Sequence, residues 1–160
     1  MLILFSLIVM RMSGAIALNP MFGRTNLPSA AKAGFVFLLS LLLYTTGGAG
    51  LYREPATMLE YGVMLLLELF VGFTLGFAME LSVMVVRFAS SAMDYVMGLN
   101  MAQIYDPQYN TQMTITSGMY YAFLMLLFFA MDGHLRLLEI FYGSARLIPF
   151  GAVRISPGLA

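Results

Sequence analysis

The sequence predicts an all-α, multi-helix protein of the membrane type, with one hydrophobic helical domain over residues 1–160. The first observation is composition: 61% of the residues are hydrophobic and 10% are charged, whereas globular domains have about half and about a quarter. The second is a mean hydropathy of +0.86, which excludes a water-soluble globule, a disordered chain and a nucleic-acid-binding domain. The third is the division of the chain into apolar runs by polar or Pro/Gly-rich breaks.

The first helix is expected in the apolar run of residues 1–22, which breaks near Asn19-Pro20. Arg11 lies in the middle of this run and no basic residue precedes it, a pattern that favours a retained helix over a cleaved signal peptide. A second helix is expected over residues 33–44. That run is short for a membrane crossing of about 20 residues, and an extension toward residue 51 makes it adequate.

The longest apolar run covers residues 56–86 and follows a break that ends at Pro55, a residue that suits the first turn of a helix. At about 1.5 Å per residue the run exceeds one bilayer crossing. Residues 87–101 are expected to form a separate helix or a bent continuation of the helix over residues 56–86. Pro107 then excludes an uninterrupted helix through the polar stretch AQIYDPQYNTQMTITS. Three to five helices are expected in total, the last two over residues 118–131 and 135–148, before a loop-like tail at 149–160.

Glu68, Gly72, Gly76 and Glu80 recur every four residues and form a narrow stripe on a helix. Glycines allow another backbone to approach closely, and a carboxylate at membrane depth is tolerated mainly where it faces protein or water. One interpretation is an interface with a partner helix or a polar conduit. The other is that the outer glutamates mark helix ends and only Glu68 is buried.

Arg11 carries a cost of about 2.5–3.5 kcal/mol if it is centred in a membrane span. It either pairs with a glutamate or belongs to a helix that lipid does not surround. Arg87 and Asp94 are interpreted as structural ion-pairing or interface groups rather than catalytic ones. A further stripe, Met93, Met97 and Met101, is either a compliant apolar seal or ordinary helix packing.

The sequence predicts no enzyme, no cofactor and no metal site. Cysteine is absent and His134 is the only histidine, so a thiol nucleophile and a histidine cluster are excluded. Asp132 lies two residues before it, but a histidine after glycine in a connecting loop is more often a polar loop residue. The phosphate-binding P-loop pattern is absent.

Four sequence blocks carry motifs in a fixed order along the chain. The first, RMSGAIALNPMFGRTNLPSAAKAGF (residues 11–35), has an arginine followed by a proline, a Phe-Gly pair, a Leu-Pro pair and a lysine. The second, MGLNMAQIYDPQ (97–108), leads into a polar loop with Asp-Pro, and the third is MLLFFAMDGHLRLLEIF (125–141). The fourth is the Ile-Pro pair that follows Arg146. Together these blocks resemble the FliR family of flagellar biosynthetic proteins, in the family's order, with the third similar to a helix that ends in Asn-Gly-His.

Two features depart from the family pattern. Asp132 stands where asparagine is usual, and the family continues with further hydrophobic helices beyond the end of this chain. We therefore expect the chain to correspond to an N-terminal portion of such a protein. The Asp106-Pro107 pair resembles the flagellar branch more than the virulence injectisome branch.

The resemblance implies a non-enzymatic subunit of the type III export gate. In that family one FliR-like chain joins FliP-like and FliQ-like subunits in a closed helical hetero-oligomer, near FlhB-like and FlhA-like proteins. Unfolded flagellar proteins enter through its pore. The implied location is the bacterial inner membrane at the flagellar basal body, with the assembly raised largely out of the membrane plane. Protein neighbours would then surround Arg11 and the glutamates.

The resemblance also gives the polar stretch a role, because it matches the position of the family's plug loop. The implied plug residues are Tyr105, Asp106, Pro107, Tyr109 and Met113, and the methionine stripe is implied to lie next to a gasket. From the residues alone the stretch remains an ordinary surface loop. Two alternatives to the gate stay open: a small-molecule or proton-coupled membrane permease subunit with Glu68 and Arg11 along a conduit, and a purely structural membrane scaffold.

Overall fold

The computed structural model describes residues 2–20, 28–46, 53–101, 103–106 and 111–152. Within these ranges the chain is almost entirely helical, which confirms the all-α prediction, and the five α-helices are the upper end of the expected number. The elements are α1 (Leu2–Ala17), α2 (Ser29–Thr45), α3 (Met58–Val96), the 3-10 helix η1 (Leu99–Met101), β1 (Gln103–Asp106), β2 (Thr111–Thr114), α4 (Ile115–Ala130) and α5 (Gly133–Leu147).

Helix α3 is the central element of the fold and runs unbroken for 39 residues, about 58 Å at 1.5 Å per residue. It begins after Thr57, whose hydroxyl accepts a hydrogen bond from the N–H of Glu60, while the Glu60 carboxylate accepts one from the N–H of Ala56. This reciprocal capping, rather than Pro55, starts the helix. It ends before Gly98, whose φ of +73° is the left-handed conformation that closes many helices. The helix is therefore one continuous element.

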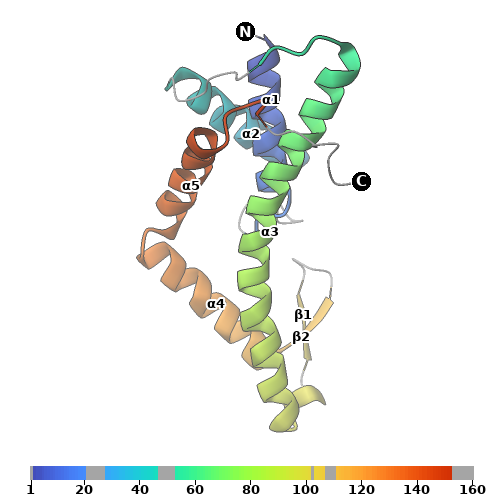
Figure 1. Cartoon of the computed structure of the whole chain (residues 1–160). Coiled ribbons are helices and arrows are strands. Elements are labelled where there is room, and N and C mark those ends of the chain that lie inside the picture. The colour runs from blue at the N-terminus through green and yellow to red at the C-terminus, as the bar shows by residue number, and fades with distance from the viewer. Residues whose placement is uncertain (1, 21–27, 47–52, 102, 107–110, 153–160) are drawn as a thin grey trace.

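The other helices pack on the two halves of α3. Helix α1 lies along the N-terminal half, and α2 packs against α1. Helix α4 starts against the C-terminal half, and α4 and α5 together form a V that leads back toward α1 (Figure 1). Among the described residues, α3 is the one helix that is both long and apolar enough to cross a membrane.

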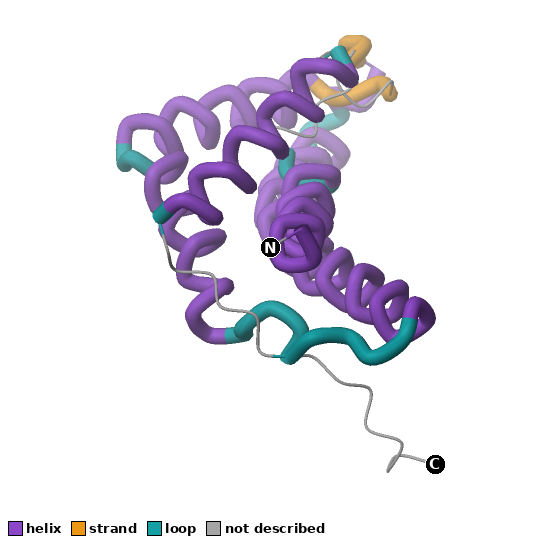
Figure 2. The backbone as a smooth tube through the Cα atoms, turned by 90° about the horizontal axis from the view of Figure 1, so that it is seen from above, coloured by secondary structure: helices purple, strands orange, loops and turns teal. Residues whose placement is uncertain are grey.

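Strands β1 and β2 form an antiparallel hairpin, which differs from the loop expected in this stretch. Residues with a high β-propensity explain the difference: Ile104 and Tyr105 in β1, and Thr111 and Thr114 in β2. Figure 1 places this hairpin beside the C-terminal half of α3, away from the N-terminal end of α1, and Figure 2 shows the two strands at one edge of the molecule.

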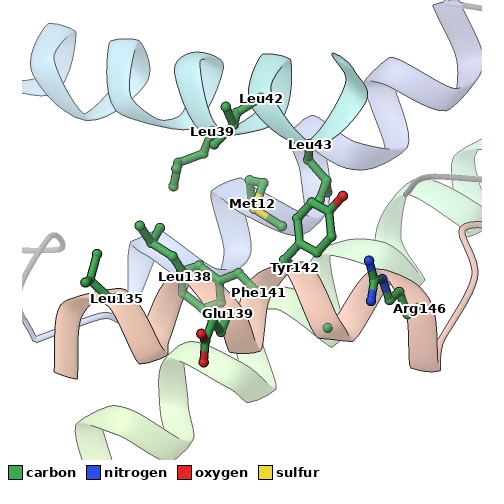
Figure 3. A pocket seen from close by; sticks show the side chains of 11 residues that line it. Met12, Leu39, Leu42, Leu43, Leu135, Leu138, Glu139, Phe141, Tyr142 and Arg146 are labelled. Atoms are coloured by element: carbon green, nitrogen blue, oxygen red, sulfur yellow. The ribbon is translucent and has the colours of Figure 1, made fainter. Parts of the chain in front are cut away.

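The hydrophobic core lies where α1, α2, α3 and α5 meet. Its most buried members on α1 are Leu7, Ile8 and Met12, and Phe141 of α5 and Phe150 pack with them. A cavity of about 610 Å³ separates α2 from α5, with Met12 at its wall (Figure 3). Apolar side chains line most of the cavity, and Glu139 and Arg146 are its charged lining residues.

Candidate functional site

A buried ion pair joins α1 to α3 in the core. The Nε and Nη2 atoms of Arg11 both lie 2.6 Å from Oε2 of Glu68. The two side chains are 0% and 1% exposed. Of the two interpretations of Arg11, the structure shows the pairing with a glutamate.

The same two side chains also hold the segment that follows α5. Nη1 of Arg11 donates to the carbonyl oxygens of Ser144, at 3.2 Å, and Ile148, at 2.9 Å. Oε1 of Glu68 accepts a hydrogen bond of 3.0 Å from the N–H of Gly151. We name this group of contacts between α1, α3 and the end of α5 the ion-pair node.

Phe150 completes the ion-pair node on its remaining side. Its ring is fully buried, and its centroid lies 4.1 Å from Cζ of Arg11, a distance at which a guanidinium is attracted to an aromatic face. The arginine charge is thus neutralised by one carboxylate, bonded to two carbonyls and covered by one ring. These contacts compensate for the loss of hydration that makes an isolated buried charge so costly.

The glycines of the predicted stripe bring the backbones of α1 and α3 together. A Cβ atom built on Gly72 would lie 2.9 Å from the backbone N of Ala15, and one on Gly76 would lie 2.7 Å from the carbonyl O of Ala15. Gly14 of α1 makes the reciprocal approach to the backbone of α3. Backbone atoms cannot rotate away as side chains can, so these positions admit no larger residue without moving the helices apart.

The structure therefore places Glu68, Gly72 and Gly76 against α1 of the same chain. Glu80, one turn further along, is half-buried. The close approach and the ion-pair node occupy consecutive turns of α3, because residues four apart share a helix face. The packing of the glycines sets the short helix separation at which Arg11 reaches Glu68.

Three of the predicted plug residues lie on the β1–β2 hairpin: Tyr105, Asp106 and Met113. Tyr105 of β1 is 58% exposed, whereas Met113 of β2 is half-buried, with its methyl group 3.4 Å from the Cβ position of Gly118 in α4. Asp106 is the last residue of β1. Pro107 and Tyr109 lie outside the described residues.

The methionine stripe does not follow a single helix, because α3 ends at Val96 and the chain turns at Gly98. Met93 is on α3, Met97 is its C-cap and Met101 lies on η1. They are 48%, 67% and 98% exposed. The three methionines thus lie on α3, at its C-cap and on η1, rather than on one face of a single helix.

Arg87 and Asp94 make the junction between α3 and α4. Cζ of Arg87 lies 4.5 Å from the ring centroid of Tyr121, and Asp94 is completely buried against the start of α4. His134 lies near the start of α5, with its ring 5.6 Å from that of Phe129. Over the described ranges, histidine and acidic side chains nowhere gather in a group of three that could hold a metal ion.

Sequence reasoning missed the C-terminal part of the ion-pair node. Its contacts to Ser144, Ile148 and Gly151 run through backbone atoms, and backbone atoms carry no signal of residue type. Phe150 offered the one available signal, an aromatic residue after Ile-Pro at the end of an amphipathic run.

A long apolar helix, a buried charge at its close-packed helix contact and further apolar helices on both halves define a helical protein of the membrane type. The model of the family described as Bacterial export proteins, family 1, matches residues 2–159. The chain belongs to this family.

Relatives with the name flagellar biosynthetic protein FliR support the same placement. The chain is 29% identical over 146 residues to the protein from Bacillus subtilis (strain 168), and this alignment covers 90% of the chain and 55% of the relative. It is 26% identical over 142 residues to the protein from Pectobacterium carotovorum subsp. carotovorum, with 89% and 54% covered. The protein from Escherichia coli (strain K12) is 22% identical over 145 residues, with 89% and 54% covered. The chain thus spans about half the length of these relatives.

Proposed function

We propose that this chain is a non-enzymatic subunit of the flagellar type III protein export gate in the bacterial inner membrane at the flagellar basal body. In this proposal it assembles with FliP-like and FliQ-like subunits near FlhB-like and FlhA-like proteins, and unfolded flagellar proteins pass through the assembly. The match to a family of bacterial export proteins over residues 2–159 carries the proposal, and the names of the relatives add flagellar biosynthesis to it.

The surface of α3 supports an assembled state. Only 17% of its most apolar stretch is buried within the chain, and large side chains such as Phe70, Phe88 and Val85 are 63%, 80% and 67% exposed. An apolar surface of this extent needs lipid or protein against it. Partner helices would satisfy it in a closed hetero-oligomer.

The β1–β2 hairpin and the methionines at the end of α3 support a role in closing the pore. Ile104 and Tyr105 are more than half exposed on β1, and this exposure is compatible with a position facing a lumen. Apolar and aromatic side chains exclude water and ions without a specific ligand. Flexible methionines deform around a passing chain. In this proposal the hairpin with residues 107–110 is the plug.

The permease alternative loses support from the ion-pair node. A conduit for a solute or proton along Arg11 and Glu68 requires water-accessible side chains, and both are buried, paired and covered by Phe150. The geometry favours a fixed structural pair over a transport path.

The test is ion leakage through the assembled gate. The chain is co-assembled with FliP-like and FliQ-like subunits in liposomes, and residues 104–113 are replaced by a Gly-Ser linker of equal length. Potassium flux should rise at least about tenfold, because the apolar side chains of the hairpin no longer close the pore. Arg136→Gln, at a charged site on α5 whose side chain is 77% exposed, is the control and should leave the vesicles tight. Tight vesicles with the linker variant would refute the plug.

A further inference from the structure

Asp94 is buried where its neighbours are not. It lies near the end of α3, where Tyr95 and Val96 are 74% and 86% exposed, yet its side chain is 0% exposed. The first turn of α4 covers it. The carboxylate faces the hydroxyl groups of Thr114 and Thr116 and the backbone N–H groups at the start of that helix.

Helix α4 lacks a cap of its own. Its N-cap residue, Thr114, is buried and makes no side-chain capping hydrogen bond to the first turn. The first N–H groups of a helix have no intrahelical acceptor and carry a partial positive charge. Asp94 places a negative charge at this end from a different helix. The carboxylate faces those N–H groups, so charge–dipole attraction contributes to the contact.

A second contact fixes the direction of α4. Arg87, about two turns before Asp94 on the same face of α3, lies over the ring of Tyr121 in the second turn of α4. The charge of Asp94 and the cation–π contact of Arg87 therefore hold α4 at two points along α3. One point alone would leave the helix free to swing about it.

The position of the hairpin depends on that of α4, because α4 begins directly after β2 along the chain. Thr114 is both the last residue of β2 and the N-cap of α4. Met113 packs over Gly118 in the first turn of that helix. On the other side, η1 packs against the end of α3, and only residue 102 separates η1 from β1. The start of α4 thus sets where the hairpin points.

We propose that Asp94 is a positioning residue that fixes the orientation of the β1–β2 hairpin against α3 through the uncapped start of α4. Its importance for the closed pore rests on the proposed function, in which this hairpin is the plug. A buried cation beside Asp94 does not fit, because the N–H groups that face the carboxylate would repel it. The carboxylate is itself the anion that this helix end accommodates.

The test measures the position of the hairpin directly. The chain has no cysteine, so the introduced pair Leu66→Cys on α3 and Ile104→Cys on β1 carries the only spin labels. Pulsed electron paramagnetic resonance gives the distribution of distances between the two labels in detergent-purified full chain. Asp94→Asn, nearly isosteric but uncharged, should at least double the width of that distribution. Asp94→Glu, which keeps the charge, should restore most of the original width.

Ser90→Ala is the matched control, because Ser90 lies about one turn earlier, is buried, and bonds only to the carbonyl of Val86. It should leave the width unchanged. An unchanged width in Asp94→Asn overturns the proposal. If Asp94→Asn loses its helical circular dichroism, Arg87→Met takes its place, with the same broadening expected and the same unchanged width as the contrary result.

Ion flux of the same variants in the assembled complex separates this proposal from the proposed function. A broadened distribution with tight vesicles supports the positioning role of Asp94 and contradicts the plug. A broadened distribution together with a leak supports both. An unchanged distribution overturns the positioning role whatever the vesicles show.

Discussion

Removing the charge of Glu68 is expected to destabilise the chain severely. Glu68→Gln keeps the size of the side chain and an oxygen that can accept the N–H of Gly151, but it leaves the guanidinium of Arg11 buried without a counter-ion. Breaking a buried pair in this way costs about 3–5 kcal/mol in free energy of unfolding. The complete burial of both side chains places this pair at the upper end of that range.

The assay is unfolding of the detergent-solubilised chain by sodium dodecyl sulfate, followed by far-ultraviolet circular dichroism because the chain has no tryptophan. The exposed pair Arg136–Glu139, with side chains 77% and 68% exposed, is the matched control. Glu139→Gln should change the free energy of unfolding by less than about 0.5 kcal/mol, because water already solvates both charges.

A double-mutant cycle separates the ion pair from the space that it fills. Arg11→Met and Glu68→Met should each cost several kcal/mol, because each leaves a buried charge unpaired. The double variant should cost clearly less than the sum of the two single losses, because it leaves no buried charge unpaired, and its remaining cost comes from the two carbonyls and the N–H of Gly151 that lose their partners. Single losses that simply add in the double variant, or a cost below about 1 kcal/mol for Glu68→Gln, would refute the reasoning.

Three further sites are tested by the same unfolding assay, two in the packing around the node and one in the turn between α4 and α5. Gly72→Ala should cost about 1–3 kcal/mol by forcing α1 and α3 apart, whereas Gly62→Ala, with open space at its Cβ position, should be neutral or stabilising; equal effects would contradict the close approach. Phe150→Ala should cost about 3–5 kcal/mol in free energy of unfolding, whereas Phe88→Ala, at an exposed site, should cost less than about 0.5 kcal/mol. A loss of under about 1 kcal/mol for Phe150→Ala would contradict the packing of Phe150 in the node. Asp132, with a φ of 54°, should tolerate glycine but lose about 1–2 kcal/mol as valine; equal stability of the two would contradict the left-handed conformation.

The stripe on α3 was predictable from sequence because its chemistry and its spacing agree. Glycines four residues apart allow a close helix contact, and a glutamate on the same face needs a partner. The identity of that partner was not predictable, because Arg11 is far away in sequence and its pairing depends on how α1 crosses α3. Periodicity within one helix holds no information about a second helix.

The methionine stripe and the hairpin show where local patterns mislead. A spacing of four predicts a shared face only while the helix continues, and Gly98 ends α3 before Met101. The polar stretch after it was predicted as a loop because of its proline and its polarity. Its β-branched and aromatic residues nevertheless pair as two short strands.

The central claim is that this chain is a subunit of an export gate, and composition of the complex tests it most directly. The chain is co-expressed with FliP-like and FliQ-like proteins, extracted in detergent and measured by native mass spectrometry. The account predicts one stoichiometric complex that contains a single copy of this chain. A chain that runs alone or as a homo-oligomer in the presence of both partners would contradict it.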